Sequence, residues 1–318
     1  METKEKKQLS KPLKIIIIVV SSIIGFFVVA LGGLNLFKFA YYSEYFSARE
    51  VLCTNPGLNE DYVPQGTAVY ENENLIITSG YMKDKSASRL YITDFDDNDH
   101  YVKLQKNGED FTGHVGGIAI GRDMFFIANN DRYYTLPLET ILNAEPESYI
   151  EIGEGTKVNN QASFIYSDDQ YLYVGEFHDG KNYITENKIE TEDGDYYAIV
   201  EVFSLDDLNT RTRVYSIRNK VQGFCQTPDG RIVLSTSYGL TDSVFYVYES
   251  EKVVDSGTTY LDAPLYILDS YSKAIKGPAM SEDLDYYNGK IVTQFESACN
   301  KYIFGKFFFA NKVVALDI

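Results

Sequence analysis

The sequence predicts an all-β protein: a β-propeller of five four-stranded blades, closed by an N-terminal strand and preceded by one transmembrane helix. Three observations predict this architecture. A turn-and-strand pattern recurs five times after residue 65, aromatic residues that favour strands are abundant, and an uncharged apolar run occupies residues 15–37. A chain of 318 residues has room for one large all-β domain and an anchor.

The repeat consists of a short polar turn followed by a tight apolar run. The five runs begin at Leu75, Phe125, Tyr171, Ile232 and Ile291. Hairpin-type turns such as Asp229-Gly230 and Asn288-Gly289 precede some of them. Repeats of about 40–50 residues that are rich in strand formers are typical of propeller blades.

Each repeat divides into four strands. The fourth strands of the first four repeats are expected at residues 101–104, 149–152, 213–217 and 265–268. The fifth repeat ends on its third strand, at residues 313–317, and has no fourth strand of its own. Because an open ring would expose two sheet edges, we expect the remaining strand-like segment, residues 49–53, to close the last blade.

The apolar run at residues 15–37 is long enough to span a bilayer as a helix. The lysines of the N-terminal tail precede the run, which predicts a single-pass protein of the cell membrane with a cytoplasmic N-terminus and an extracytoplasmic C-terminal domain. The predicted organisation is a basic tail at 1–14, a signal-anchor helix at 15–37, a stalk at 38–47 and the propeller at 48–318. A signal peptide cleaved at Val28-Val29-Ala30 is the alternative.

The net charge of −17 is unevenly distributed. Residues 1–37 carry five lysines and two glutamates, a charge of +3, which leaves −20 for the rest of the chain. Such an acidic domain repels nucleic acid, so we exclude DNA or RNA as a partner. The charge serves solubility at a cell surface, or it attracts cations or a cationic partner.

The cysteines and histidines give no metal or cofactor signal. Cys225 lies in an apolar strand and is expected in the core. The sequence does not decide whether Cys53 and Cys299 form a disulfide. The three histidines show no metal-ligand spacing with one another or with the cysteines, and no phosphate-binding glycine loop is present. We therefore predict no metal site, and the cofactor is unknown.

Polar residues stand where the innermost strand of each blade should begin. The candidates for ligand binding in this set are Gln65, His114, Gln222 and Glu282. Glycine or alanine next to several of them allows close approach of the strands where the ring is narrowest. The alternative is that these polar groups only satisfy one another and buried water around the axis.

A second set of candidates follows the second strands. It consists of Tyr81, Tyr238 and Glu296, which we place at the opposite end of the blades from the first set. Tyrosine and carboxylate side chains suit stacking and hydrogen bonding to a polar ligand such as a sugar. The alternative is ordinary turn chemistry, because Ser, Asn and Gly surround these positions.

Long connections interrupt the repeat at four places, residues 178–197, 250–262, 270–280 and 297–311. Insertions in a propeller project from one face or from the rim, where loops often carry binding residues.

The turn-and-strand repeats over residues 48–318 resemble those of bacterial extracytoplasmic β-propellers with quinoprotein-like and lactonase-like blades. The resemblance implies the fold, but it identifies no catalytic residue, because this fold carries enzymes, adhesins and scaffolds alike. Glycosidases with five blades typically place acids at several inner-strand starts, whereas here only Glu282 and Asp283 do so.

We therefore predict a membrane-anchored extracytoplasmic propeller that binds a polar ligand or an envelope protein without catalysis. The first alternative is an envelope enzyme that hydrolyses glycans or lactones, which requires two carboxylates or a metal at one mouth of the channel. The second is a structural scaffold of a membrane complex, which would use a side loop such as residues 178–197 and leave the channel without a ligand.

Overall fold

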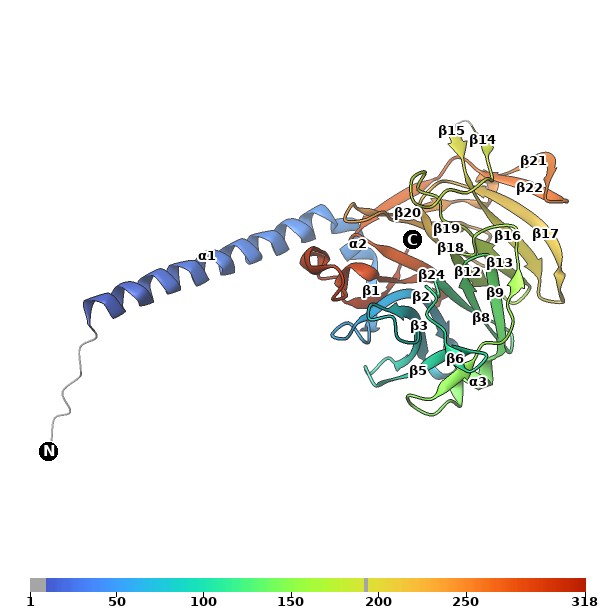
Figure 1. The fold of residues 1–318 in the computed structure, drawn as a ribbon. Helices are drawn as coiled ribbons and strands as arrows, with labels where there is room; N and C mark the ends of the chain where they lie inside the picture. Colours follow the sequence, from blue (N-terminus) through green and yellow to red (C-terminus); the bar gives the residue numbers. More distant parts are fainter. Residues whose placement is uncertain (1–9, 192–193) are drawn as a thin grey trace.

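The computed structural model describes residues 10–191 and 194–318. Five blades surround a common axis, and one long helix projects from the edge of the ring (Figure 1). The innermost strands neighbour one another in the order β24, β2, β7, β12, β18 and back to β24. The predicted all-β propeller of five blades is confirmed.

The first two blades contain the expected antiparallel hairpins. From the axis outward, blade 1 consists of β2 (Tyr62–Tyr70), β3 (Leu75–Met82), β4 (Arg89–Asp94) and β5 (Asp99–Lys106). Blade 2 consists of β7 (Gly117–Gly121), β8 (Met124–Asn129), β9 (Arg132–Pro137) and β11 (Thr156–Lys157). The connections hold the short elements η1 (Glu71–Glu73), β6 (Glu109–Asp110) and α3 (Leu138–Leu142).

The third and fourth blades follow the same order. Blade 3 consists of β12 (Phe164–Ser167), β13 (Tyr171–Gly175), β16 (Ala198–Ser204) and β17 (Asp207–Ile217). Blade 4 consists of β18 (Val221–Gln226), β19 (Ile232–Thr236), β20 (Ser243–Tyr248) and β23 (Lys273–Gly277). Their insertions hold the hairpin of β14 (Ile189–Thr191) with β15 (Gly194–Tyr196), and η2 (Ser250–Lys252).

Blade 5 joins the two ends of the domain. It consists of β24 (Ser281–Tyr287), β25 (Lys290–Phe295), β26 (Lys312–Leu316) and β1 (Arg49–Thr54), with η3 (Glu296–Ala298) and η4 (Ile303–Phe308) between β25 and β26. Strand β1 pairs antiparallel with β26, with Arg49 opposite Leu316 and Val51 opposite Val314. The predicted closure by an N-terminal strand is confirmed, and it removes the open edge of blade 5.

Two predicted fourth strands belong to other blades. Strand β10 (Tyr149–Glu151) was expected in blade 2, but it pairs parallel with β5 of blade 1. Strand β22 (Ala263–Leu268) was expected in blade 4, but it pairs parallel with β17 of blade 3 and forms a hairpin with β21 (Val253–Tyr260). Each strand buries its apolar side chains on the preceding blade, as Ile150 does beside Leu104. An apolar strand pattern does not specify which sheet edge the strand joins.

The core is aromatic and lies within and between the blades. In the largest cluster, which joins blades 3, 4 and 5, the rings of Tyr173 and Phe224 stack at 5.1 Å. All three cysteines are buried and free, so the disulfide between Cys53 and Cys299 that the sequence left open is not formed. Cys225 lies in the core, as predicted.

The segment expected as a stalk is helical. Helix α1 spans Lys11–Tyr41, and α2 (Ser43–Ala48) leads directly into β1. The hydroxyls of Tyr41 and Tyr42 donate hydrogen bonds of 2.7 and 2.9 Å to Asp242, and the ring of Tyr45 packs edge-on against Phe295. The end of α1 is therefore attached to the propeller by side-chain contacts.

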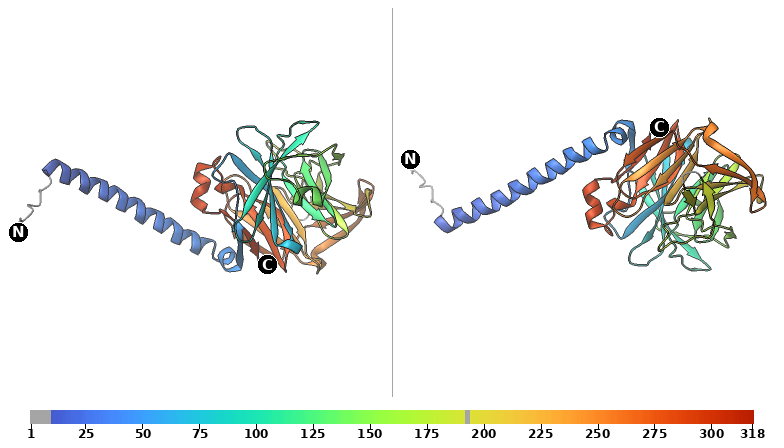
Figure 2. Two further views of the ribbon diagram at one scale, coloured as in Figure 1. Left: turned by 90° about the horizontal axis from the view of Figure 1, so that it is seen from below. Right: turned by 90° about the horizontal axis from the view of Figure 1, so that it is seen from above.

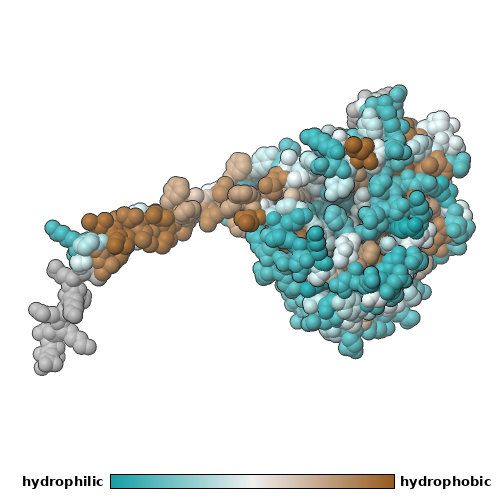
Figure 3. All heavy atoms as spheres, viewed as in Figure 1, coloured by the Kyte–Doolittle hydropathy of each residue, from teal (hydrophilic) through white to brown (hydrophobic). Residues whose placement is uncertain are grey.

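Helix α1 is the one helix among the described residues that is long and apolar enough to cross a membrane. Its apolar surface is continuous along the part that extends away from the propeller (Figure 3). A secretory signal sequence meets the same criteria of length and composition. Helix α1 is therefore compatible both with a retained signal-anchor helix and with a cleaved signal peptide.

Glycines allow the innermost strands to approach closely. A Cβ atom on Gly66 would lie 2.7 Å from the amide nitrogen of Ile118, and one on Gly117 would lie 2.5 Å from that of Ile165. A Cβ atom on Gly223 would lie 2.7 Å from the amide nitrogen of Leu284. These neighbours are backbone atoms of the next blade, so they can move only if the ring widens.

We expect Gly223→Ala to lower the free energy of unfolding by about 3 kcal/mol, because the added methyl group overpacks the axis. Urea denaturation of the full chain in detergent measures the change. Gly108→Ala is the control: its turn has open space around it and a φ of +76°, so the expected cost is about 1 kcal/mol. An equal or smaller loss for Gly223→Ala would mean that the axis is not tightly packed.

Candidate functional site

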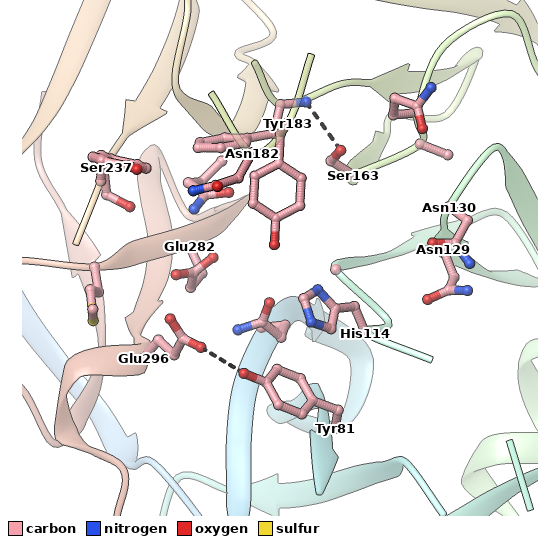
Figure 4. A pocket seen from close by; sticks show the side chains of 18 of the residues that line it. Tyr81, His114, Asn129, Asn130, Ser163, Asn182, Tyr183, Ser237, Glu282 and Glu296 are labelled. Atoms are coloured by element: carbon pink, nitrogen blue, oxygen red, sulfur yellow. Dashed lines mark hydrogen bonds between the residues drawn. The ribbon is translucent and has the colours of Figure 1, made fainter. Parts of the chain in front are cut away.

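A cavity of about 670 Å³ opens at one end of the propeller axis (Figure 4). Its wall includes all seven residues that the sequence singled out: Gln65, Tyr81, His114, Gln222, Tyr238, Glu282 and Glu296. They come from the inner hairpins of blades 1, 4 and 5 and from the segment that leads into blade 2. The structure therefore brings the two predicted sets together in one place.

The prediction that the two sets lie at opposite ends of the blades is wrong. In the antiparallel hairpin of β2 and β3, Val63 pairs with Tyr81 and Pro64 pairs with Gly80. The start of the first strand thus lies beside the end of the second strand. The same geometry holds in blade 5, where Ser281 pairs with Phe295. Glu282 and Glu296 are the next residues after this pair, so they lie at the same end of the hairpin.

Two carboxyl groups form the acidic part of the cavity wall. Glu282 is only 3% exposed, and burial raises its pKa well above the ordinary value, with the charges of Glu296 and Asp283 adding to the rise. Burial also raises the pKa of Glu296, a rise that Lys301 and the hydroxyls of Tyr302 and Tyr81 oppose. Burial and the charge of Glu296 together favour the protonated form of Glu282.

Hydroxyl donors and one cation surround Glu296. Its Oε1 accepts hydrogen bonds from the hydroxyls of Tyr81 and Tyr302, at 3.3 and 3.2 Å. The ammonium group of Lys301 contacts the hydroxyl of Tyr81 and lies 4.8 Å from the centre of its ring. These contacts hold Glu296 in one orientation at the cavity wall, as Figure 4 shows for Tyr81.

Aromatic rings form flat surfaces in the same cavity. The His114 ring stacks on Tyr81, with 4.6 Å between ring centres and planes inclined by 15°. The pKa of His114 is lowered, first because the cavity wall limits hydration of the ring and second because Lys301 is close. Tyr183 points into the cavity from the opposite side, and its ring packs edge-on against Phe177 (Figure 4).

A deeper layer of polar groups lies around the axis below the cavity. The carboxylate of Asp283 accepts a hydrogen bond of 3.0 Å from the Ile118 amide, and the Gln294 side chain donates one of 2.6 Å to the Gly66 carbonyl. The hydroxyls of Ser235 and Ser281 lie 2.6 Å apart. Mutual hydrogen bonding accounts for part of this layer, in which Oδ1 of Asp283 and Oε1 of Gln294 are buried without a hydrogen-bond partner among the described residues.

In the cavity wall, some polar side chains support the backbone and others are free to contact a ligand. Among the amides, Gln65 is buried and donates to the carbonyl of Pro64, and Asn129 accepts from the amide of Val115, so these two support the backbone. Gln161 is exposed and Gln222 half-buried in the wall. Their amide groups are accessible to a molecule that enters the cavity.

The wall also includes loop residues that were not among the candidates, such as Asn182, Tyr183, Lys301 and Tyr302. They belong to the connections 178–197 and 297–311, which the sequence marked only as insertions. Strand periodicity gives no position for a loop side chain, so their inclusion depended on how each loop folds back over the axis.

Comparison with known proteins finds only distant structural similarity. No protein-family model matches the sequence, and no curated protein matches it. The PQQ-bound aldose sugar dehydrogenase of Streptomyces coelicolor is 12% identical, with 78% of each chain covered and a TM-score of 0.44.

Two further solved structures are similar at the same level. A gluconolactonase from Xanthomonas campestris is 11% identical, covering 80% of this chain and 88% of that chain, with a TM-score of 0.39. The calcium-binding protein regucalcin from Agrobacterium tumefaciens is 12% identical, covering 85% and 93%, with a TM-score of 0.40. Similarity this distant carries no assignment of function, and the five-bladed fold is established by the strand pairing of the chain itself.

Proposed function

We propose that this protein is a membrane-anchored extracytoplasmic propeller that binds a polar, hydroxyl-rich ligand in the axial cavity without transforming it. The observation that supports this most is the convergence of acidic, amide and aromatic side chains on one cavity of about 670 Å³. Ligand pockets of this size, with a few convergent polar groups, are the usual binding sites of single domains.

The chemistry of the wall suits a ligand with many hydroxyl groups. The carboxyl groups of Glu282 and Glu296 accept hydrogen bonds, and the amides of Gln161 and Gln222 both donate and accept them. The face of Tyr183 offers a surface for the apolar C–H face of a sugar ring. Acidity at the cavity also disfavours anionic ligands.

The position outside the cytoplasm follows from α1. Lysines precede the apolar run, with Lys14 the last of them, and lysines near a membrane span stay on the cytoplasmic side. The propeller then lies on the other side of the membrane. Protease accessibility of the propeller in intact cells tests this orientation.

We expect His114→Ala and Tyr238→Ala each to weaken binding about tenfold, or ~1.4 kcal/mol, while the domain stays folded. The assay is the shift in melting temperature of the full chain with a panel of neutral mono- and disaccharides, since a ligand at about 100 times its Kd stabilises by about 2.7 kcal/mol. Tyr149→Ala, on the exposed edge strand β10, is the matched control. Loss of fold in both cavity variants would instead mean that these side chains are structural.

A hydrolase of envelope glycans or lactones is the second candidate, because Glu282 and Glu296 lie at the same mouth. Acid–base hydrolysis needs one carboxyl group that is protonated and one that is ionised. The ammonium group of Lys301 and the hydroxyls around Glu296 favour its ionised form more than the surroundings of Glu282 do. Product formation from the saccharide panel that Glu282→Gln abolishes would favour the enzyme over the binding protein.

The scaffold alternative has less support. It predicted that the side loop at residues 178–197 forms the interaction surface and that the channel is not involved. Instead Asn182, Tyr183 and Thr185 of this loop line the cavity, so loop and cavity form one site.

A further inference from the structure

The short helix η4 carries an exposed apolar surface that the binding site does not use. Ile303 is 73% exposed, Phe304 71%, Phe307 50% and Phe309 44%. Phe308 packs against the largest core cluster, and Gly305 is buried where a Cβ atom would overlap the carbonyl of Ser297. The helix is therefore held in place by one side while these four side chains, here called the η4 patch, face outward.

The η4 patch lies on the side of the propeller from which α1 departs. Both views of Figure 2 show η4, in dark red, at this edge of the domain, next to the base of the helix. The ammonium group of Lys38 lies 4.4 Å from the centre of the Phe309 ring and 4.9 Å from that of Phe39. This contact joins the end of α1 to the end of η4.

The same contact sets the level of the patch relative to a membrane. The uncharged run of α1 ends at Phe37, and Lys38 is the first charged residue after it, so Lys38 stands at the boundary between hydrocarbon and headgroups. Phe309 touches Lys38 and hence lies at that boundary. Exposed Phe39 and Tyr41 continue the aromatic surface on the helix.

Several cationic side chains lie beside the patch, although the acids Glu44 and Asp242 also lie near the end of α1. Lys306 lies within η4, Lys301 precedes it, and Arg49 stacks on Phe46 at 4.5 Å close to Lys38. Elsewhere the propeller is strongly acidic and repels anionic headgroups. Aromatic side chains mixed with lysines are the usual composition of segments that lie in the membrane interface.

We propose that the η4 patch inserts into the headgroup region of the outer leaflet and forms a second membrane contact beside α1. The inference rests on the proposed function only in that α1 spans the membrane. Two contacts fix the rotation of the propeller about α1. Because Tyr302 lines the axial cavity and Ile303 begins η4, the membrane contact also sets the orientation of the cavity rim.

A tryptophan placed in the patch tests the proposal, because the chain contains no tryptophan. Phe304→Trp, Phe27→Trp in α1, and Val254→Trp on β21 at the far edge of the propeller are reconstituted as full chains in phosphatidylcholine nanodiscs. Fluorescence excited at the red edge of the absorption band is compared with and without brominated lipid. The bromine lies near the glycerol end of the acyl chain for Phe304→Trp and Val254→Trp, and near the methyl end for Phe27→Trp, which lies at the middle of the span. Val254 is an exposed apolar side chain, 50% against 71% for Phe304, and lies away from α1, so it serves as the control.

We expect the brominated lipid to quench Phe304→Trp by about half, to quench Phe27→Trp, and to leave Val254→Trp unchanged. If Phe27→Trp is quenched and Phe304→Trp behaves like Val254→Trp, α1 spans the membrane but the patch does not enter it, which overturns the proposal and makes a protein the occupant of the patch. If Phe27→Trp is not quenched, the anchor itself is wrong, and the proposal fails with it.

Discussion

A chain in which residues 49–54 are replaced by a Gly/Ser linker of equal length should lose the cooperative unfolding transition of the propeller. Strand β1 pairs along its length with β26 and buries Leu52 and Cys53. Without it, the edge of blade 5 is open and these apolar contacts are lost. The expected loss is about 5 kcal/mol or more, comparable with the whole stability of a typical domain.

The matched control is the same replacement of β10, residues 149–151. This strand also lies on an outer edge, and it buries Ile150 at 4% exposure, but it does not join the two ends of the chain. We expect it to cost about 2–3 kcal/mol and to leave the transition cooperative. Calorimetry of both variants in detergent measures the difference, and equal effects would show that ring closure adds nothing beyond strand burial.

Glu282→Gln should raise the free energy of unfolding at pH 8 by about 1–3 kcal/mol, because it removes the cost of ionising a buried carboxyl group. The folded-state pKa of Glu282 is raised, whereas in the unfolded chain it ionises near its ordinary value. The native state therefore binds more protons. The stabilisation from the protonated group is complete at acidic pH and is lost as pH rises through the folded-state pKa.

Denaturant unfolding at pH 5 and pH 8 measures this linkage. We expect the stability gap between the two pH values to be smaller in Glu282→Gln than in the natural chain. Glu145→Gln, at an exposed position, is the control and should leave the gap unchanged. A variant that is less stable than the natural chain at pH 8 would contradict the prediction.

The same substitution separates a functional from a structural role. If Glu282→Gln is more stable but binds the best saccharide of the panel at least tenfold more weakly, the natural carboxyl group is retained at a cost in stability. A residue whose substitution stabilises the fold but weakens binding belongs to a ligand site. A stabilised variant with unchanged binding would remove Glu282 from the proposed site.

The sequence alone determined the parts of this protein that depend on local pattern. Turn signals and apolar runs repeat within about 60 residues, so the five inner hairpins follow from adjacent residues. Because an open sheet edge is a liability, a closing strand was expected at residues 49–53, and β1 (Arg49–Thr54) supplies it. Candidate positions such as Gln65 and Glu296 were found because strand ends carry polar residues.

Only the tertiary structure decided which segments meet. The apolar strands β10 and β22 could join either neighbouring sheet, and burial on the preceding blade selected the parallel pairing. Antiparallel pairing placed Tyr81 beside the start of β2, which merged two predicted sites into one. Lys301 entered that site because its loop folds back over the axis. These outcomes depend on contacts between residues far apart in the chain, which a local pattern does not specify.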